Sequence, residues 1–338
     1  MRINSTHIKR SLLSCLLVMI SVVGILLYLT HQVMREPVLI SEPKLFKITK
    51  GSSFNQISKQ LVEQNIIEQR FWLRNYVRIY PELAHIKAGT YQISPNQLLG
   101  EILNMMNQGD EHQFYVTFIE GTRLSDWLKV LAEHPHIQQK IESQHYADVA
   151  TAVGIKNSHP EGMFFPDTYA FTDNTTDIAI LKRAHQRMNH ELAAVWQQRA
   201  LELPLNSEYE VLILASIIEK ESADKSEYRR ISSVFTNRLN RNMRLQTDPT
   251  VIYGVRDEYQ GDIKRSHLKD ANAYNTYKIK GLPPTPIAMP GLEALRAAVD
   301  PEISDFLYFV SDGEGRHVFS TNLQAHNEAL QRYLEKTK

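Results

Sequence analysis

The chain begins with a charge-free apolar run, residues 11–30 (SLLSCLLVMISVVGILLYLT). A helix of this length spans about 30 Å, the thickness of a bilayer's hydrocarbon core. Arg2, Lys9 and Arg10 precede the run and only Arg35 follows it closely, which predicts that residues 1–10 are cytoplasmic. A cleaved signal peptide is the alternative, but the run is long for one and no small-x-small cleavage site follows. The pattern therefore predicts a single-pass anchor, with the rest of the chain exported across the membrane.

The next two segments are predicted to be a linker and a small domain. Residues 31–43 (HQVMREPVLISEP) are polar and contain proline; they reach at most about 43 Å when extended, which keeps the next domain near the membrane. Within residues 44–110, the apolar spacing predicts strands at 44–49 and 88–94 and helices at 53–63, 68–80 and 96–108. This strand–helix–helix–strand order resembles the LysM fold, a class that often binds glycans. A spacer domain without a ligand is the alternative reading.

Residues 111–338 are predicted to form one larger domain. Because helices and strands are both predicted, the expected fold class is α+β. Its predicted elements are a strand at 114–119, a helix from 125, a long helix at 176–200, a helix over LILASIIEKES, helices at 226–240, 291–298 and 323–335, and a hairpin over FLYFVSDGEGRHVFST. Residues 140–175 and 241–290 have no clear period and are predicted to be irregular.

Composition excludes several classes of function. The 338 residues are 43% hydrophobic and 22% charged with no formal net charge, so nothing indicates a nucleic-acid partner. No HExxH motif, cysteine pair or glycine-rich phosphate loop is present, and we expect neither a metal nor a cofactor. The only cysteine, Cys15, lies in the apolar run, so the part predicted to be exported has no disulfides.

The segment LILASIIEKES carries two glutamates at the end of an apolar helix. Glu219 and Glu221 are two residues apart and point about 200° from one another on a helix, so they cannot share a face. Glu221 lies over large aliphatic side chains, those of Leu214, Ile217 and Ile218. A carboxyl group in such surroundings loses hydration and retains its proton to higher pH. Glu221 is therefore the better candidate for a general acid, although two solvated glutamates at a helix end would look similar.

Two later segments supply polar and aromatic side chains on proline-rich loops. Amides, hydroxyls and aromatic rings on stiff loops suit sugar recognition, although structural turns have a similar composition. The candidates in MRLQTDPTVIYGV and AYNTYKIKGLPPTPIAMPG are Gln246, Thr247, Asp248, Tyr253, Tyr274, Asn275 and Tyr277.

Five ordered motifs together resemble the YceG-like family. They are ASIIEKES, VFTNRL, RLQTDPTVIYG, AYNTY with GLPPTPIAMPG, and the ending FLYFV…HVFSTN…HN. The resemblance also covers the anchor, the LysM-like module and EGMFFPDTY. One departure is visible, because the turn that usually reads GLPPGPI has Thr285 in place of glycine. That substitution can change the loop's shape but removes no chemical group.

This resemblance implies a lytic transglycosylase of peptidoglycan with a YceG-like catalytic domain. Such enzymes cut the β-1,4 bond between N-acetylmuramic acid and N-acetylglucosamine and leave a 1,6-anhydro end. The family's catalytic glutamate falls on Glu221. The implied partners are peptidoglycan glycan strands and the membrane-embedded cell-wall synthesis machinery, with endolytic cutting that ends the growth of nascent strands.

Other readings remain open from the sequence. Asp248 opposite Glu221 would favour a hydrolase with two carboxylates, whereas an aspartate before proline usually caps a turn. Glu120 is expected to be structural, and His317 and His326 are weaker candidates for substrate contact. A glycan-binding scaffold without turnover and a module that binds proteins through its proline loops are further alternatives.

Overall fold

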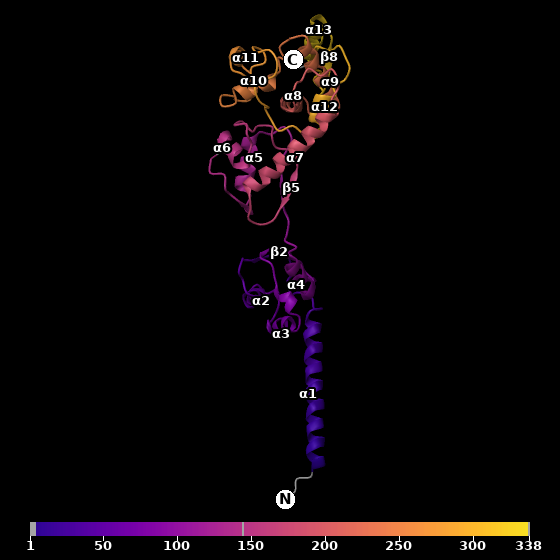
Figure 1. The fold of residues 1–338 in the computed structure, drawn as a ribbon. Helices are drawn as coiled ribbons and strands as arrows, with labels where there is room; N and C mark the ends of the chain where they lie inside the picture. The colour runs from indigo at the N-terminus through magenta and orange to yellow at the C-terminus, as the bar shows by residue number, and fades with distance from the viewer. Residues whose placement is uncertain (1–4, 144, 337–338) are drawn as a thin grey trace. The chain divides into compact units, whose positions relative to one another are not determined.

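The structure, a computed structural model, describes residues 5–143 and 145–336 (Figure 1). Arg2 and the rest of residues 1–4, part of the predicted cytoplasmic tail, lie outside the described residues. The chain divides after Phe114 into two compact units, which we call unit 1 and unit 2. The mixture of helices and short strands agrees with the predicted α+β class.

Helix α1 (Ser5–Val33) contains the apolar run. Within the described residues, its segment Leu12–Val33 is the one stretch long and apolar enough to cross a membrane. Its leucine, isoleucine and valine side chains are exposed over most of that length. Such exposure is expected for a helix surrounded by lipid.

The rest of unit 1 has the predicted order of elements. Strand β1 (Lys44–Ile48) pairs antiparallel with β2 (Gly89–Ile93), and Phe46 lies opposite Tyr91. Helices α2 (Phe54–Glu63), α3 (Phe71–Ile79) and α4 (Leu99–Gln108), with the 3-10 turn Pro81–Ala84, complete the unit. Ser53 begins α2 with a capping box that includes Gln56. The arrangement is a compact α/β unit with a core of its own.

The segment expected to be a linker is part of this unit. Residues 31–33 continue α1, and Met34, Val38 and Ile40 are buried in the core of unit 1. Pro37 also forms an isolated antiparallel bridge with Leu98. The polar composition of the segment concealed these apolar anchors, which are spaced too irregularly to show a period.

Unit 2 is built around α8 (Glu208–Glu221). Every side chain from Val211 to Ile218 is buried, because α8 contacts α7 (Asp177–Gln197), α9 (Tyr228–Asn240), α10 (Asp248–Gly254) and α12 (Leu292–Val299). A helix that is apolar on all sides is typically internal. The central position of α8 fixes its C-terminal end inside the unit.

Shorter elements complete unit 2. They are α5 (Leu124–Glu133), α6 (Tyr146–Val153), α11 (Arg265–Lys269), the 3-10 turn Lys225–Glu227, α13 (Leu323–Lys336), and the strand pairs β3 (Phe114–Thr117) with β5 (Thr168–Phe171), β4 (Ile137–Gln138) with β6 (Thr175–Thr176) and β7 (Tyr308–Ser311) with β8 (His317–Ser320). The β7–β8 hairpin confirms the prediction for FLYFVSDGEGRHVFST. Elements α6, β5, α10 and α11 lie in the two stretches predicted to be irregular, so that prediction was incomplete.

Gly162 joins two of the sequence motifs. Its φ is +79°, and a Cβ atom there would lie 2.4 Å from the Cβ of Pro286. Only glycine combines this conformation with such a close approach. EGMFFPDTY therefore packs directly against GLPPTPIAMPG, although more than a hundred residues separate them.

Candidate active site

The end of α8 positions the candidate acid. Ser207 begins the helix by accepting a hydrogen bond from the backbone N–H of Glu210, and the chain leaves the helix in an extended conformation at Ser222. Glu219 and Glu221 find different partners, as their spacing predicted. Glu219 accepts hydrogen bonds from the Tyr228 hydroxyl and the Gly291 N–H, whereas Glu221 accepts one from the Thr247 hydroxyl.

Glu221 has the electrostatics of a general acid. Burial raises the pKa of its carboxyl group to about 7; the nearby charge of Asp248 adds to this, and the Thr247 hydrogen bond opposes it. The carboxyl group also lies at the C-terminal end of α8, where the helix dipole disfavours negative charge. The residue is half-buried, so it keeps some exposure to solvent. Glu221 can thus carry a proton near neutral pH and still be reached.

A cluster of threonines fixes Thr247. Its N–H donates to the Thr276 hydroxyl oxygen at 3.0 Å. The Thr250 hydroxyl lies 2.8 Å from that of Thr276 and donates to the Thr247 carbonyl. All three threonines are buried. The hydroxyl that reaches Glu221 is therefore held by a network rather than by a mobile loop.

Asp248 begins α10 and is held in place by Tyr277. The Tyr277 hydroxyl donates to Asp248 Oδ1 at 2.7 Å. Burial and the Asp248 carboxylate both raise the pKa of Tyr277, so its hydroxyl stays protonated and remains a donor. Asp248 is exposed, and its electrostatic effect on Glu221 is to favour the protonated acid.

Gln246 is held in an unusual backbone conformation. Its φ is +53°, and its N–H donates to the Thr276 carbonyl. Its side-chain carbonyl accepts a hydrogen bond from Arg238, a buried arginine that also donates to the carbonyls of Arg244, Leu245 and Leu307. In the described part of the chain, the Gln246 amide nitrogen has no hydrogen-bond acceptor, which leaves a donor for a ligand.

Asn275 supports the loop from inside. Its amide nitrogen donates to the carbonyls of His267, Leu268 and Asp270, and its carbonyl accepts from the N–H of Tyr277. The residue is fully buried. Asn275 therefore holds Thr276 and Tyr277 in position, and the polar groups of its side chain are already occupied.

Tyr253 lies in the interior and binds a carboxylate that sequence reasoning missed. Its hydroxyl donates to Glu161 at 3.2 Å. Glu161 also accepts from the Tyr146 hydroxyl and the Leu124 N–H, and burial raises its pKa. The signal for Glu161 was a carboxylate two residues before the apolar stretch MFF in EGMFFPDTY. Tyr274 packs against Tyr253 at 4.9 Å, and its hydroxyl lies 2.8 Å from that of Thr285, the residue that departs from the family pattern.

The structure thus gathers part of the predicted set around Glu221. Thr247, Asp248 and Tyr277 are linked to it directly or through one another, and Gln246 adjoins Thr247. Asn275 supports Tyr277 by accepting its N–H, and Tyr253 and Tyr274 pack against each other. Direct contact of these three residues with a sugar stays a prediction. Arg238 and Thr276 were missed because partnerships between segments leave no periodic signal in a sequence.

The weaker candidates have structural partners. Glu120 forms an ion pair with Lys225. The backbone N–H of His317 donates to the Glu227 carboxylate, and its ring Nδ1 lies 2.8 Å from Oε2 of the same group. His326 stacks on Tyr308, and burial lowers its pKa. Across residues 5–143 and 145–336, no group of three or more His, Cys, Asp or Glu side chains could hold a metal ion.

Comparisons with known proteins cover most of the chain. The model of the YceG-like family matches residues 46–332. An endolytic murein transglycosylase from Bacillus subtilis is 30% identical over 304 residues, which cover 85% of this chain and 84% of that protein. One of the same name from Streptococcus pneumoniae is 27% identical over 83% of this chain but only 56% of its own length.

A solved structure agrees with the sequence comparisons. The crystal structure of a yceG-like protein from Listeria monocytogenes superposes with a TM-score of 0.53 at 30% identity, covering 85% of this chain and 99% of that one. Because the family model spans well over half of the chain, the fold and the motifs around Glu221 have one explanation: this protein is a member of the YceG-like family.

Proposed function

We propose that this protein is an endolytic lytic transglycosylase that cuts peptidoglycan glycan strands. The observation that carries the proposal is the Glu221 carboxyl group, whose pKa of about 7 and fixed hydrogen bond to Thr247 suit a group that gives up a proton and takes it back. The relatives from Bacillus and Streptococcus are named for this activity, which supports the substrate class.

In the first step, protonated Glu221 donates its proton to the glycosidic oxygen that links N-acetylmuramic acid to N-acetylglucosamine. The bond from this oxygen to C1 of the muramic acid breaks, and C1 gains oxocarbenium character. Burial raises the acid's pKa to about 7, the Thr247 hydrogen bond opposes this rise, and the charge of Asp248 adds to it.

In the second step, the Glu221 carboxylate accepts the proton of the C6 hydroxyl group of the same muramic acid. The C6 oxygen then bonds to C1 and closes the 1,6-anhydro ring. The proton lost in the first step is recovered, no water is consumed, and one carboxyl group serves as acid and then base. Tyr277 lies near this carboxyl group and Gln246 adjoins Thr247, and both would orient the sugar.

A hydrolytic muramidase needs a second carboxyl group or an activated water. Asp248 is the candidate that the sequence offered, but the Tyr277 hydroxyl already engages one of its oxygens, and the residue is the first of α10. We therefore assign Asp248 an electrostatic role. The two reactions give products that differ by one water molecule.

The test is digestion of intact murein by the full-length protein in detergent, followed by mass analysis of the products. We expect anhydro ends from the unaltered protein and none from Glu221→Gln, which keeps the size and shape of the side chain. Products heavier by one water would identify a hydrolase, and binding without any product would identify a scaffold.

Glu219→Gln is the matched control. Glu219 lies on the same turn of α8 and also has a pKa raised by burial, but it faces Tyr228 and Gly291 instead of Thr247. We expect this variant to release anhydro products at close to the normal rate. If both variants lost anhydro-product release to the same degree, the activity would depend on the structure of the end of α8 and not on the Glu221 proton.

The proposed location is the cell inner membrane, with α1 as a single-pass anchor, the N-terminus cytoplasmic and unit 2 periplasmic. Unit 1 is proposed to be a LysM-like module on the strength of its strand–helix–helix–strand order. An anchored enzyme meets newly made strands first, so we also propose that it works beside the cell-wall synthesis machinery. Protease added to spheroplasts would test the orientation, because a periplasmic C-terminal end is cleaved and a cytoplasmic one is protected.

A further inference from the structure

Helix α3 packs against the end of α1 that leaves the predicted membrane span. The His31 and Tyr76 rings stack with centroids 6.2 Å apart. A hollow between the two helices is lined by Leu27, Thr30, His31, Tyr76, Ile79 and Tyr80. Leu27 is six residues before Val33, the end of the span, which is about 9 Å along a helix axis. The contact therefore lies at the depth where hydrocarbon gives way to headgroups.

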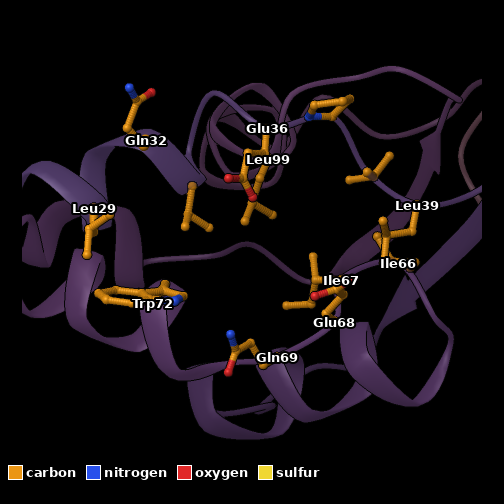
Figure 2. A pocket seen from close by; sticks show the side chains of 13 residues that line it. Leu29, Gln32, Glu36, Leu39, Ile66, Ile67, Glu68, Gln69, Trp72 and Leu99 are labelled. Atoms are coloured by element: carbon orange, nitrogen blue, oxygen red, sulfur yellow. The ribbon is translucent and has the colours of Figure 1, made fainter.

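The aromatic side chains of α3 fit this depth. Phe71 is 54% exposed, the apolar Ile79 is 43% exposed, and Tyr80, which directly follows α3, is 38% exposed. Trp72 lines a cavity of about 380 Å³ together with Leu29 of α1 (Figure 2). Tryptophan and tyrosine concentrate at membrane interfaces because one end of each is apolar and the other polar.

Three arginines follow one another along α3, one at its N-terminal cap and two within the helix. Arg70, Arg74 and Arg78 are four residues apart, are exposed, and line a second hollow of about 300 Å³ with Phe71 and Asn75. Within the described residues none of them forms an ion pair; Arg70 and Arg78 donate only to the asparagine oxygens of Asn55 and Asn75. Residues four apart share a helix face, so the three charges form one basic stripe.

We propose that α3 is an interfacial helix whose arginine stripe binds the anionic phospholipid headgroups of the leaflet from which α1 emerges. The stripe is basic although Glu68 and Glu82 lie just beyond the two ends of the helix. Guanidinium groups bind phosphate through paired hydrogen bonds, and the exposed aromatic residues would lie at the acyl boundary. The proposal rests on α1 being a membrane anchor and is independent of the reaction at Glu221.

The predicted consequence is that unit 1 is held against the bilayer rather than free above it. Each basic residue near an anionic surface increases binding about fivefold, so three should make docking depend strongly on lipid charge and on salt. Neutral lipid should hold unit 1 weakly, through the aromatic residues alone.

The test uses the full-length protein reconstituted in lipid nanodiscs. Cys15 is the only cysteine, so Cys15→Ser provides a background in which Asn75→Cys, beside the stripe, carries a single spin label. Its accessibility to a water-soluble nickel reagent is compared in phosphatidylcholine alone and in phosphatidylcholine mixed with phosphatidylglycerol. We expect accessibility to fall when phosphatidylglycerol is present and to recover at high salt.

The matched variants replace three cations by glutamine. Arg70→Gln, Arg74→Gln and Arg78→Gln together should abolish the response to phosphatidylglycerol, and Arg74→Gln alone should reduce the docked-to-free ratio about fivefold. Lys129→Gln, Lys182→Gln and Lys269→Gln, three exposed lysines of unit 2, should leave the response unchanged.

Two outcomes would overturn the proposal: equal accessibility in both lipids, or the same response from both triple variants. A protein that fails to remain in the nanodisc would refute the anchor itself. Murein digestion by the same samples reports separately on Glu221, so loss of lipid docking cannot be confused with failure of the proposed reaction.

Discussion

The Thr247 hydroxyl donates its hydrogen bond to the Glu221 carboxyl group across a separation of 26 residues in the sequence. Thr247 is itself fixed by Thr250 and Thr276, so its hydroxyl group stays in one place with respect to the Glu221 carboxyl group. The contact has a defined electrostatic effect: it lowers the pKa of Glu221, whereas burial and the charge of Asp248 raise it.

Activity should fall as pH rises through about 7, the pKa of Glu221, because the first step uses the protonated acid. Thr247→Val removes the influence that lowers this pKa, so the alkaline limb of the kcat/KM profile should move to higher pH. Asp248→Asn removes an influence that raises it, so the limb should move to lower pH. Rates of release of anhydro product across the pH range measure both shifts.

Asp148→Asn serves as the control for these profiles, because Asp148 is an exposed residue of α6. Its limb should coincide with that of the unaltered protein. Shifts of Thr247→Val and Asp248→Asn in the same direction would contradict the assignment of the limb to Glu221.

Glu221→Gln should stabilise unit 2 at alkaline pH. The folded-state pKa of Glu221 is above its ordinary value of 4.5, so the unaltered protein loses stability as pH rises from there through about 7. Glutamine carries no charge, and the variant should gain roughly 1–3 kcal/mol above pH 7 and little below pH 4.5. Urea unfolding followed by the fluorescence of Trp127 and Trp196 measures the difference, with exposed Glu202→Gln as the control.

Gly162→Ala should cost more than Gly281→Ala. Both glycines have φ near +80°, but an added Cβ meets Pro286 at Gly162 and nothing within 4 Å at Gly281. Gly281→Ala should therefore pay only for backbone strain, about 1–2 kcal/mol, and Gly162→Ala should lose roughly 1–3 kcal/mol more through overlap. Equal changes in the free energy of unfolding would show that EGMFFPDTY and GLPPTPIAMPG can separate without cost.

Asn275→Ala should destabilise the loop that carries Thr276 and Tyr277. It removes a buried side chain that bonds three carbonyls and one N–H, and the cost should be about 2–4 kcal/mol. Exposed Asn189→Ala on α7 is the matched control. Normal stability with lost activity would instead favour the prediction that Asn275 touches the sugar.

Periodic features were the most predictable from the sequence. The apolar run of α1, the amphipathic α9 and the hairpin β7–β8 each follow from spacing alone. The different surroundings of Glu219 and Glu221 also follow from helix geometry. Helix α10 was missed because DPTVIYG is short and bounded by proline and glycine, which are typical of turns.

The polar interior could not be predicted in the same way. Glu161, Arg238 and Thr276 work through partners from distant segments, and no periodicity marks such pairs. The resemblance of the motifs indicated which loops mattered, but not which of their residues face the carboxyl group and which face the core. Asn275 shows the difference. Its side-chain amide is of a kind that suits sugar recognition, but the amide nitrogen donates its hydrogen bonds to backbone carbonyls.

The burial of Met34, Val38 and Ile40 affects how a soluble form of the protein should be prepared. Truncation at residue 44, where the first strand begins, would remove three apolar side chains from a small core and expose the surface that they cover. A start at or before Met34 keeps that core closed. A truncated enzyme that aggregates during purification would then reflect a missing piece of unit 1 rather than any defect in the catalytic part.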